Sequence, residues 1–138
     1  MDDPLYRDEI LDHYFASPHR GHLEPPDLTA QLDNPLCGDR IRLELGLEPT
    51  GRIGRVRFDG HGCAISQAAA SMLAAHLEGR PVAEARRFSA DDMVRLLGVA
   101  LTPARLKCGL LAWRTLQRAL PAQGEPVAIG SDTPSTTA

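Results

Sequence analysis

The chain has 138 residues, of which 43% are apolar and 4% aromatic, and its 15 basic and 18 acidic side chains give a formal net charge of −3. This length favours one domain over two, and the near-balance of charge lacks the electrostatic footprint of a protein that binds nucleic acid or an anionic membrane surface. The chain contains no run of about 18 apolar residues, so the sequence predicts no membrane-spanning segment.

The first half of the chain predicts one helix followed by three strands. Apolar residues at helical spacing indicate the helix, and alternation of apolar and polar residues indicates the strands. These elements cover residues 5–15, 28–32, 41–47 and 53–58. The alternation breaks at Gly54, so we expect a β-bulge or a slip in register there. The second and third strands form a hairpin with one buried face, and Glu44 is expected on the opposite face.

The second half predicts helices. An alanine-rich helix comes first, two short helices follow, and a proline after Thr102 marks the start of the last one. These helices cover residues 64–77, 82–87, 91–97 and 103–120. In the last helix we expect one apolar stripe to be buried, formed by Leu106, Leu110, Trp113 and Leu116.

Strands that come first and helices that mostly follow argue for an α+β fold, a small antiparallel sheet with helices packed on one face. We expect one domain over residues 1–120 and a disordered tail rich in Pro, Ser and Thr over residues 121–138. The chain opens on acidic residues rather than on a basic stretch with an apolar run, so we expect no signal peptide and a cytoplasmic location.

The candidate functional residues are three cysteines and one aspartate. Cys37 and Cys63 lie beside glycines, in a turn and between a strand and a helix, while Cys108 lies in the last helix. Their odd number and wide spacing argue against disulfides, and the sequence has no C-x-x-C pair. Asp39 follows Cys37 by two residues, so both side chains can point the same way in a strand. Three thiolates and a carboxylate suit tetrahedral zinc, with the oxygen as the more replaceable ligand.

Four motifs in chain order resemble the IscU/SufU/NifU-type family of iron–sulfur cluster assembly proteins, from the first helix to about Leu120. The motifs are Leu5-Tyr6-Arg7 with Asp12-His13-Tyr14; Asn34-Pro35-Leu36-Cys37-Gly38-Asp39-Arg40-Ile41; Gly60-His61-Gly62-Cys63-Ala64-Ile65-Ser66; and Pro103-Ala104-Arg105-Leu106-Lys107-Cys108 with Leu111-Ala112-Trp113. The resemblance implies that Cys37, Asp39, Cys63 and Cys108 converge at one exposed end and bind metal. His61, beside Cys63, is expected to face solvent.

Within this family the chain resembles the SufU-like branch more than the IscU-like one. Lys107 stands where IscU-like scaffolds usually have a histidine before the third cysteine. However, the chain lacks the insertion that SufU-like members usually carry between the second and third cysteines.

The resemblance implies a cysteine desulfurase of the SufS/IscS type as partner, and downstream cluster carriers or apo-proteins as recipients. One hypothesis is a zinc-binding sulfurtransferase that accepts persulfide sulfur, with Cys37 as the preferred acceptor, Cys108 as the alternative and Asp39 as the exchangeable ligand. A second is a scaffold on which the same residues hold a transient [2Fe–2S] cluster. A third, of another class, is a zinc-stabilised binding module without chemistry.

Overall fold

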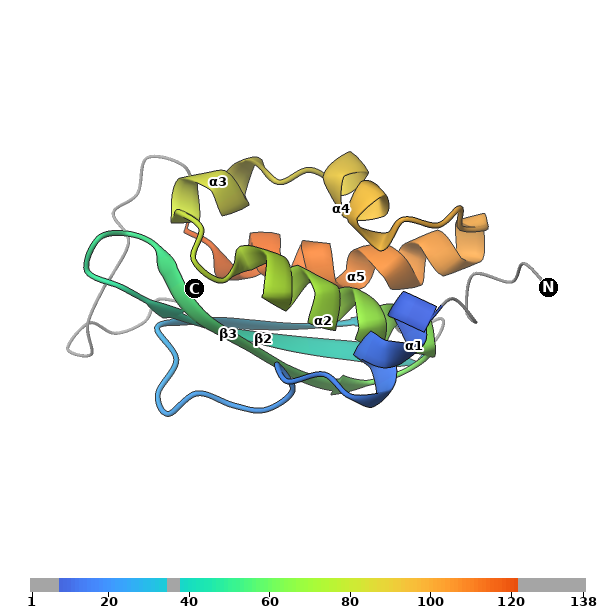
Figure 1. Cartoon of the computed structure of the whole chain (residues 1–138), viewed down its shortest axis with the longest axis horizontal. Coiled ribbons are helices and arrows are strands. Elements are labelled where there is room, and N and C mark those ends of the chain that lie inside the picture. The colour runs from blue at the N-terminus through green and yellow to red at the C-terminus, as the bar shows by residue number, and fades with distance from the viewer. Residues whose placement is uncertain (1–7, 35–37, 122–138) are drawn as a thin grey trace.

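The structure is a computed structural model, and it describes residues 8–34 and 38–121. One helix, three strands and four further helices follow one another in these ranges (Figure 1). The elements are α1 (Asp8–Phe15), β1 (Leu28–Asn34), β2 (Asp39–Leu47), β3 (Ile53–His61), α2 (Ala64–Leu77), α3 (Val82–Arg87), α4 (Ala90–Leu97) and α5 (Pro103–Ala119). The start of the predicted first helix and the predicted tail beyond residue 121 lie outside the described residues. No helix in the described ranges combines the length and apolar content of a membrane span.

The three strands form an antiparallel sheet in the order β1-β2-β3. Alternate residues of β2 face the helices and are fully buried, namely Ile41, Leu43 and Leu45. Near the hairpin turn Gly46 pairs with Arg55 and Leu47 pairs with Ile53, which leaves Gly54 without a partner. The predicted bulge at Gly54 is therefore confirmed.

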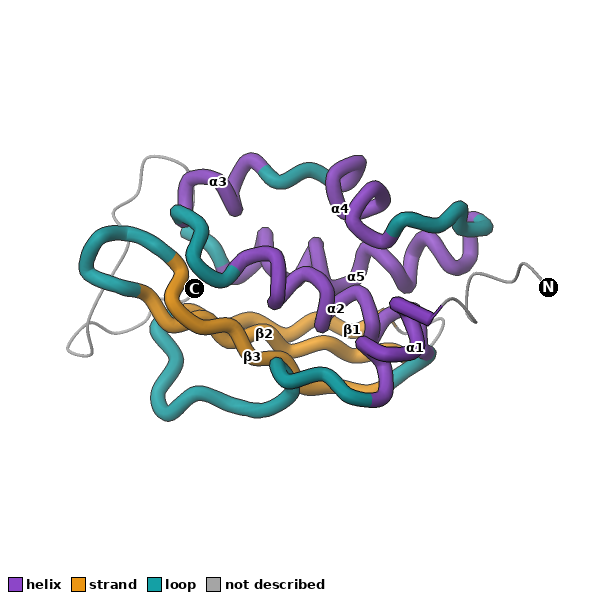
Figure 2. Tube along the Cα trace, in the orientation of Figure 1, coloured by secondary structure: helices purple, strands orange, loops and turns teal. Residues whose placement is uncertain are grey.

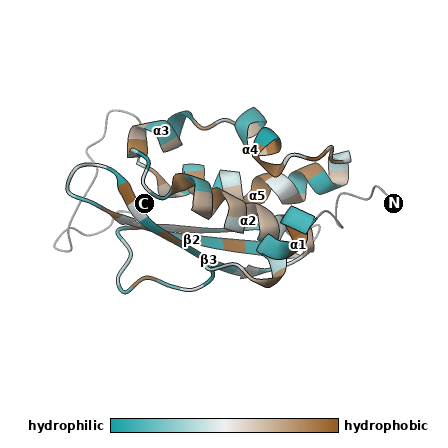
Figure 3. Ribbon diagram, viewed as in Figure 1, coloured by the Kyte–Doolittle hydropathy of each residue, from teal (hydrophilic) through white to brown (hydrophobic). Residues whose placement is uncertain are grey.

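The helices are stacked on one face of the sheet, as predicted. Figures 1 and 2 show α2 and α5 on the sheet, with α3 and α4 above them, and α1 packs against α2. Figure 3 shows α2 coloured largely apolar, whereas α1 carries more hydrophilic residues. Because the side chains of Ala68, Ala69 and Ala70 are small and fully buried, α2 can approach both the sheet and the neighbouring helices closely. The core lies between the sheet and the α2–α5 layer.

The outer face of the sheet is not simply exposed to solvent, so the prediction of one buried face is wrong at Glu44. Phe58 on β3 pairs with the segment before β1, because its N–H donates to the His19 carbonyl and its carbonyl accepts from Gly21 N–H, both at 2.9 Å. The segment continues to Leu23, which is buried, and the Leu23 N–H donates to Glu44 Oε1 at 2.6 Å. This contact covers Glu44, whose relative exposure is 3%.

The buried face of α5 also differs from the predicted stripe. Leu116 is buried as expected, but Leu106, Leu110 and Trp113 are only partly buried. The buried face consists mainly of smaller residues, namely Cys108, Gly109, Leu111, Ala112, Thr115, Leu116 and Ala119. Because α5 contacts α2 and the sheet at once, small side chains take the inner positions and the larger ones move to the flank.

Candidate metal centre

Three of the predicted ligands come together from three different elements. Asp39 begins β2, Cys63 is the N-cap residue of α2, and Cys108 lies in the second turn of α5. One ligand atom from each side chain can be chosen so that all lie within 4.8 Å of one another. Tetrahedral zinc with Zn–S bonds of about 2.3 Å requires ligand atoms roughly 3.8 Å apart, so small side-chain adjustments suffice to bind it.

The Asp39 carboxylate is buried, and only one of its two oxygens has a hydrogen-bond partner among the described residues. Its relative exposure is 1%, and Oδ1 accepts a hydrogen bond from the Cys63 N–H at 3.0 Å. Oδ2 is buried and has no hydrogen-bond partner among the described residues. A buried carboxylate oxygen without a partner carries a large desolvation cost, which a bound cation would offset. The donor set of two sulfurs and one carboxylate oxygen therefore fits a zinc ion.

Two glycines bring β3 and α2 close to the start of β2. Gly62 has φ of +140°, and a Cβ atom there would lie 2.0 Å from Asp39 Oδ1. Gly60 has φ of +154°, and its Cβ would lie 2.0 Å from the Arg40 carbonyl oxygen. Only glycine combines these backbone angles with so close an approach. The first turn of α2 is thereby placed beside Asp39, where the positive end of the helix dipole favours anionic ligands.

Cys63 and Cys108 differ in their access to solvent. Cys63 is exposed, whereas Cys108 is buried in α5 with a relative exposure of 5%. The residue after it, Gly109, lies against Leu97 and Leu101, and a Cβ there would lie about 3 Å from both side chains. This packing fixes α5 near Cys108. A site of this kind has a buried sulfur at its base and an accessible sulfur at its rim.

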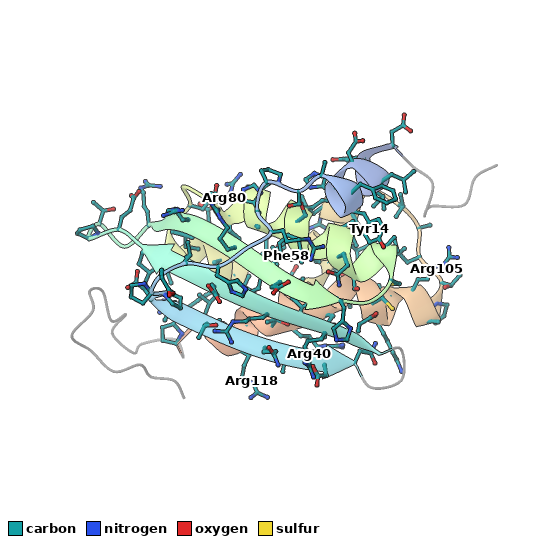
Figure 4. All side chains as sticks on the ribbon, turned by 90° about the horizontal axis from the view of Figure 1, so that it is seen from below. Tyr14, Arg40, Phe58, Arg80, Arg105 and Arg118 are labelled. Carbon is teal, nitrogen blue, oxygen red and sulfur yellow. The ribbon has the colours of Figure 1, made fainter. Side chains whose placement is uncertain are left out.

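A chain of hydrogen bonds that sequence reasoning missed supports the Cys63 end of α2. Arg20 Nη2 donates to Gln67 Oε1 at 3.2 Å, Gln67 Nε2 donates to Ser66 Oγ at 3.2 Å, and Ser66 Oγ donates to the Cys63 carbonyl at 3.0 Å. The Arg20 guanidinium also lies 4.8 Å from the centre of the Phe58 ring, which Figure 4 labels. No local sequence signal indicates this contact, since Arg20 comes from the segment that pairs with β3.

The fourth predicted ligand, Cys37, lies outside the described residues. The residues on either side of this gap are close together, since Asn34 pairs with Asp39 and the Gly38 N–H donates to the Asn34 carbonyl at 2.9 Å. Asn34 and Asp39 thus lie at the end of the sheet where the three described ligands meet. His61 is exposed, as expected, and is not part of the three-residue group.

Comparison with known proteins identifies the family. The model of the NifU-like N-terminal domain matches residues 5–124. The chain belongs to this family. A relative from Bacillus subtilis, named zinc-dependent sulfurtransferase SufU, is 34% identical, and the match covers 84% of this chain and 89% of the relative. The iron–sulfur cluster assembly scaffold protein IscU of Thermotoga maritima is 36% identical, with coverage of 84% and 92%.

Solved structures of this family share the fold. A crystal structure from Fervidobacterium islandicum, described as an iron–sulfur cluster assembly scaffold protein for the SUF system, superposes with a TM-score of 0.75. The two chains are 28% identical, and the superposition covers 85% of this chain and 97% of the F. islandicum chain. The predicted α+β fold and the family resemblance are thus both confirmed.

The comparison with SufU also bears on the missing insertion. The SufU alignment has 133 positions, but only 84% of the 138 residues of this chain take part in it. Both this alignment and the one with T. maritima IscU, which spans 132 positions, therefore include residues of the relative that have no counterpart in this chain.

Proposed function

We propose that this chain is a zinc-dependent sulfur acceptor in iron–sulfur cluster assembly, which takes persulfide sulfur from a cysteine desulfurase in the cytoplasm. The observation that carries the proposal is the grouping of Asp39, Cys63 and Cys108, with one ligand atom of each within 4.8 Å of the others. The buried Oδ2 of Asp39 also has no hydrogen-bond partner among the described residues. The sulfurtransferase activity in the name of the B. subtilis relative supports the same role. Cys37 would complete a four-residue set of metal ligands.

Bound zinc would hold the cysteine sulfurs as thiolates at neutral pH. Asp39 is the ligand best suited to exchange, because carboxylate oxygen binds zinc less tightly than thiolate does. Its Oδ1 accepts from the Cys63 N–H, so the carboxylate would stay in place when Oδ2 is released. Release of Oδ2 would open the site to the incoming partner without unfolding its surroundings.

The transfer itself needs no external oxidant or reductant. The Cys37 thiolate would attack the terminal sulfur of the desulfurase persulfide and form a new S–S bond. The S–S bond of the donor would break, and the desulfurase cysteine would leave as a thiolate. Cys108 is the alternative acceptor, but its burial limits its access to a partner.

The second candidate function is a scaffold on which a [2Fe–2S] cluster, as cargo, is assembled by the same residues. The match to T. maritima IscU, which is named a scaffold protein, favours it. Lys107 weighs against it, because a charged ammonium does not ligate iron where the IscU-like scaffolds that the sequence resembles have a histidine. Recipients would then be cluster carriers or apo-proteins.

The deciding experiment is the turnover of the organism's own cysteine desulfurase, with and without this protein, under reducing conditions. We expect several-fold stimulation that Cys37→Ser abolishes and Asp39→Ala strongly reduces. The matched control is His61→Ala, which alters an exposed neighbour of Cys63 and should leave stimulation unchanged. If the wild-type chain does not stimulate turnover, the sulfur-acceptor role is wrong, and anaerobic cluster reconstitution then tests the scaffold role.

A further inference from the structure

The outward side of α5 carries a row of cations that have no ion-pair partner within the described part of the chain. Lys107, Arg114 and Arg118 are exposed and have no ion pair or side-chain hydrogen bond with any residue in the described ranges. Their spacings of seven and four residues place them on one helix face. The whole of α5 contains no acidic residue that could balance them. Figure 4 shows Arg118 projecting away from the molecule past the edge of the sheet.

An apolar row flanks these cations. Leu106, Leu110 and Trp113 are only partly buried, although their spacing is that of a packed helix face. Surface helices usually interleave opposite charges, which support one another at i,i+4 positions. A cationic row beside partly exposed large apolar side chains is instead the pattern of a helix face that receives an acidic, amphipathic partner.

A face with the complementary pattern lies on α1 of the same chain. Asp8, Asp12 and Phe15 occupy positions i, i+4 and i+7, so they share one stripe. Neither aspartate has an ion pair with a residue in the described part of the chain, and both are exposed. Phe15 is 76% exposed, and no other large apolar side chain of the described residues is classed as exposed. The α1 stripe thus presents two acids and one aromatic ring to solvent.

We propose that α1 of one copy packs antiparallel along α5 of a second copy. In this register Asp8 faces Arg118, Asp12 faces Arg114 and Phe15 lies on Leu110. The two helix faces match in length, because both charged pairs are four residues apart, which is about 6 Å along a helix. The contact would neutralise the α5 cations and cover the Phe15 ring.

The contact is heterologous, since α1 and α5 flank α2 on different sides (Figure 4). One helix pair buries less surface than the roughly 1,200 Å² of a stable interface, so the association should be weak and grow with concentration. The inference does not depend on the proposed function, because neither stripe includes a candidate metal ligand.

The test is sedimentation equilibrium of the zinc-loaded full chain over a range of concentrations. We expect the weight-average mass to rise with concentration in about 0.1 M salt and to return to the monomer value near 1 M, where the Debye length falls from about 10 Å to about 3 Å. Two charge reversals, Asp8→Lys/Asp12→Lys and Arg114→Glu/Arg118→Glu, should each weaken self-association at least tenfold.

A mixture of the two reversed variants decides the matter. Each variant carries like charges on both helices and repels itself, but α1 of either is complementary to α5 of the other, so mixing should restore association. Arg52→Glu/Arg55→Glu is the control, since it makes the same change in net charge at exposed arginines just before and within β3 rather than on α5. A wild-type chain that stays monomeric, a control variant as weakened as the α5 variant, or variants that do not recover on mixing would overturn the proposal.

Discussion

Gly62 determines how closely the start of α2 approaches Asp39. A Cβ atom at this position would lie 2.0 Å from Asp39 Oδ1, and the backbone has φ of +140°. Any side chain there must either displace the carboxylate or shift the Cys63 end of the helix. The geometry of the candidate metal centre thus depends on a residue that has no side chain and ligates nothing.

We therefore expect Gly62→Ala to impair both metal binding and stability. Backbone strain and the clash with Asp39 should lower the free energy of unfolding by about 3 kcal/mol, and displacement of the carboxylate should weaken zinc binding at least tenfold. Urea denaturation and competition with a chromogenic zinc chelator measure the two effects.

Gly51→Ala is the matched control for this change. Gly51 also has a positive φ, +88°, but a Cβ there would meet nothing within 4 Å. The substitution should lower the free energy of unfolding by about 1 kcal/mol through backbone strain and leave zinc affinity unchanged. Equal losses of zinc affinity in the two variants would show that the contact with Asp39 is unimportant.

At the scale of elements, the segment before β1 is held against the sheet by hydrogen bonds to Glu44. His22 Nδ1 lies 3.0 Å from Glu44 Oε2, Arg42 Nε donates to the same oxygen at 2.7 Å, and the Leu23 N–H donates to Oε1. Burial alone would raise the pKa of Glu44, but these hydrogen bonds outweigh it and hold the pKa below its ordinary value. The folded state therefore favours the ionised carboxylate.

This lowered pKa predicts how the stability lost in Glu44→Gln depends on pH. The carboxylate contributes stability above its unfolded pKa of about 4.3, and that contribution is lost as pH falls through the lower folded pKa. At pH 7 the variant should be less stable by about 1.5–3 kcal/mol, the usual range for hydrogen bonds to a charged group. The difference should shrink on acidification in urea melts. Glu48→Gln, at an exposed carboxyl, is the control, and a difference that does not vary with pH would contradict the assignment.

His22 responds to pH in the opposite direction. Its ring lies between Glu44 and Asp59, with Nε2 3.2 Å from Asp59 Oδ2, and the Glu44 carboxylate chiefly raises its pKa. A raised pKa contributes stability that is fully present below the unfolded value of about 6.5 and is lost as pH rises through the folded value. The same melts should show this contribution disappear above neutral pH.

The elements themselves were largely predictable, because their signals are local. Alternation indicated the strands and even the bulge at Gly54, and proline after Thr102 indicated the start of α5. Burial was harder to predict wherever it depends on a distant segment. The alternation in β2 places Glu44 on the outer face of the sheet, and it is buried only because the segment around Leu23 covers it. In α5 the small Cys108 lies inward while the large Trp113 lies at the flank, because close packing against α2 and the sheet favours small side chains on the inner face.

The candidate site was predictable only in part for the same reason. The residue types of Cys63, Cys108 and Asp39 indicate metal chemistry, but their separation in the chain says nothing about convergence, and family resemblance supplied that expectation. The Arg20–Gln67–Ser66 chain could not have been predicted, because it depends on how the segment before β1 pairs with β3.

At the scale of the whole molecule, the candidate metal centre overlaps the core at a single described ligand, Cys108, while Asp39 and Cys63 lie outside the core. The centre lies at one end, where β2 begins and α2 starts, whereas the largest buried side chains, such as Phe58, Leu73 and Leu111, pack between the sheet and the helices along their length. The core is built from apolar contacts that need no metal. A ligand that binds only the folded state adds stability, about 2.7 kcal/mol at a free concentration one hundred times its dissociation constant.

Removal of zinc should therefore lower the melting temperature without unfolding the domain. For a domain of this size each 1 kcal/mol corresponds to roughly 3–6 °C, so the zinc-free protein should melt about 10 °C lower and still show a cooperative transition. Differential scanning calorimetry with far-UV circular dichroism measures both properties, and Cys63→Ser prepared with zinc should match the zinc-free wild type. Loss of helical signal at 25 °C on zinc removal would instead favour a zinc-stabilised module. In that case the metal would maintain the fold, and release of Asp39 Oδ2 could not open the site without unfolding its surroundings.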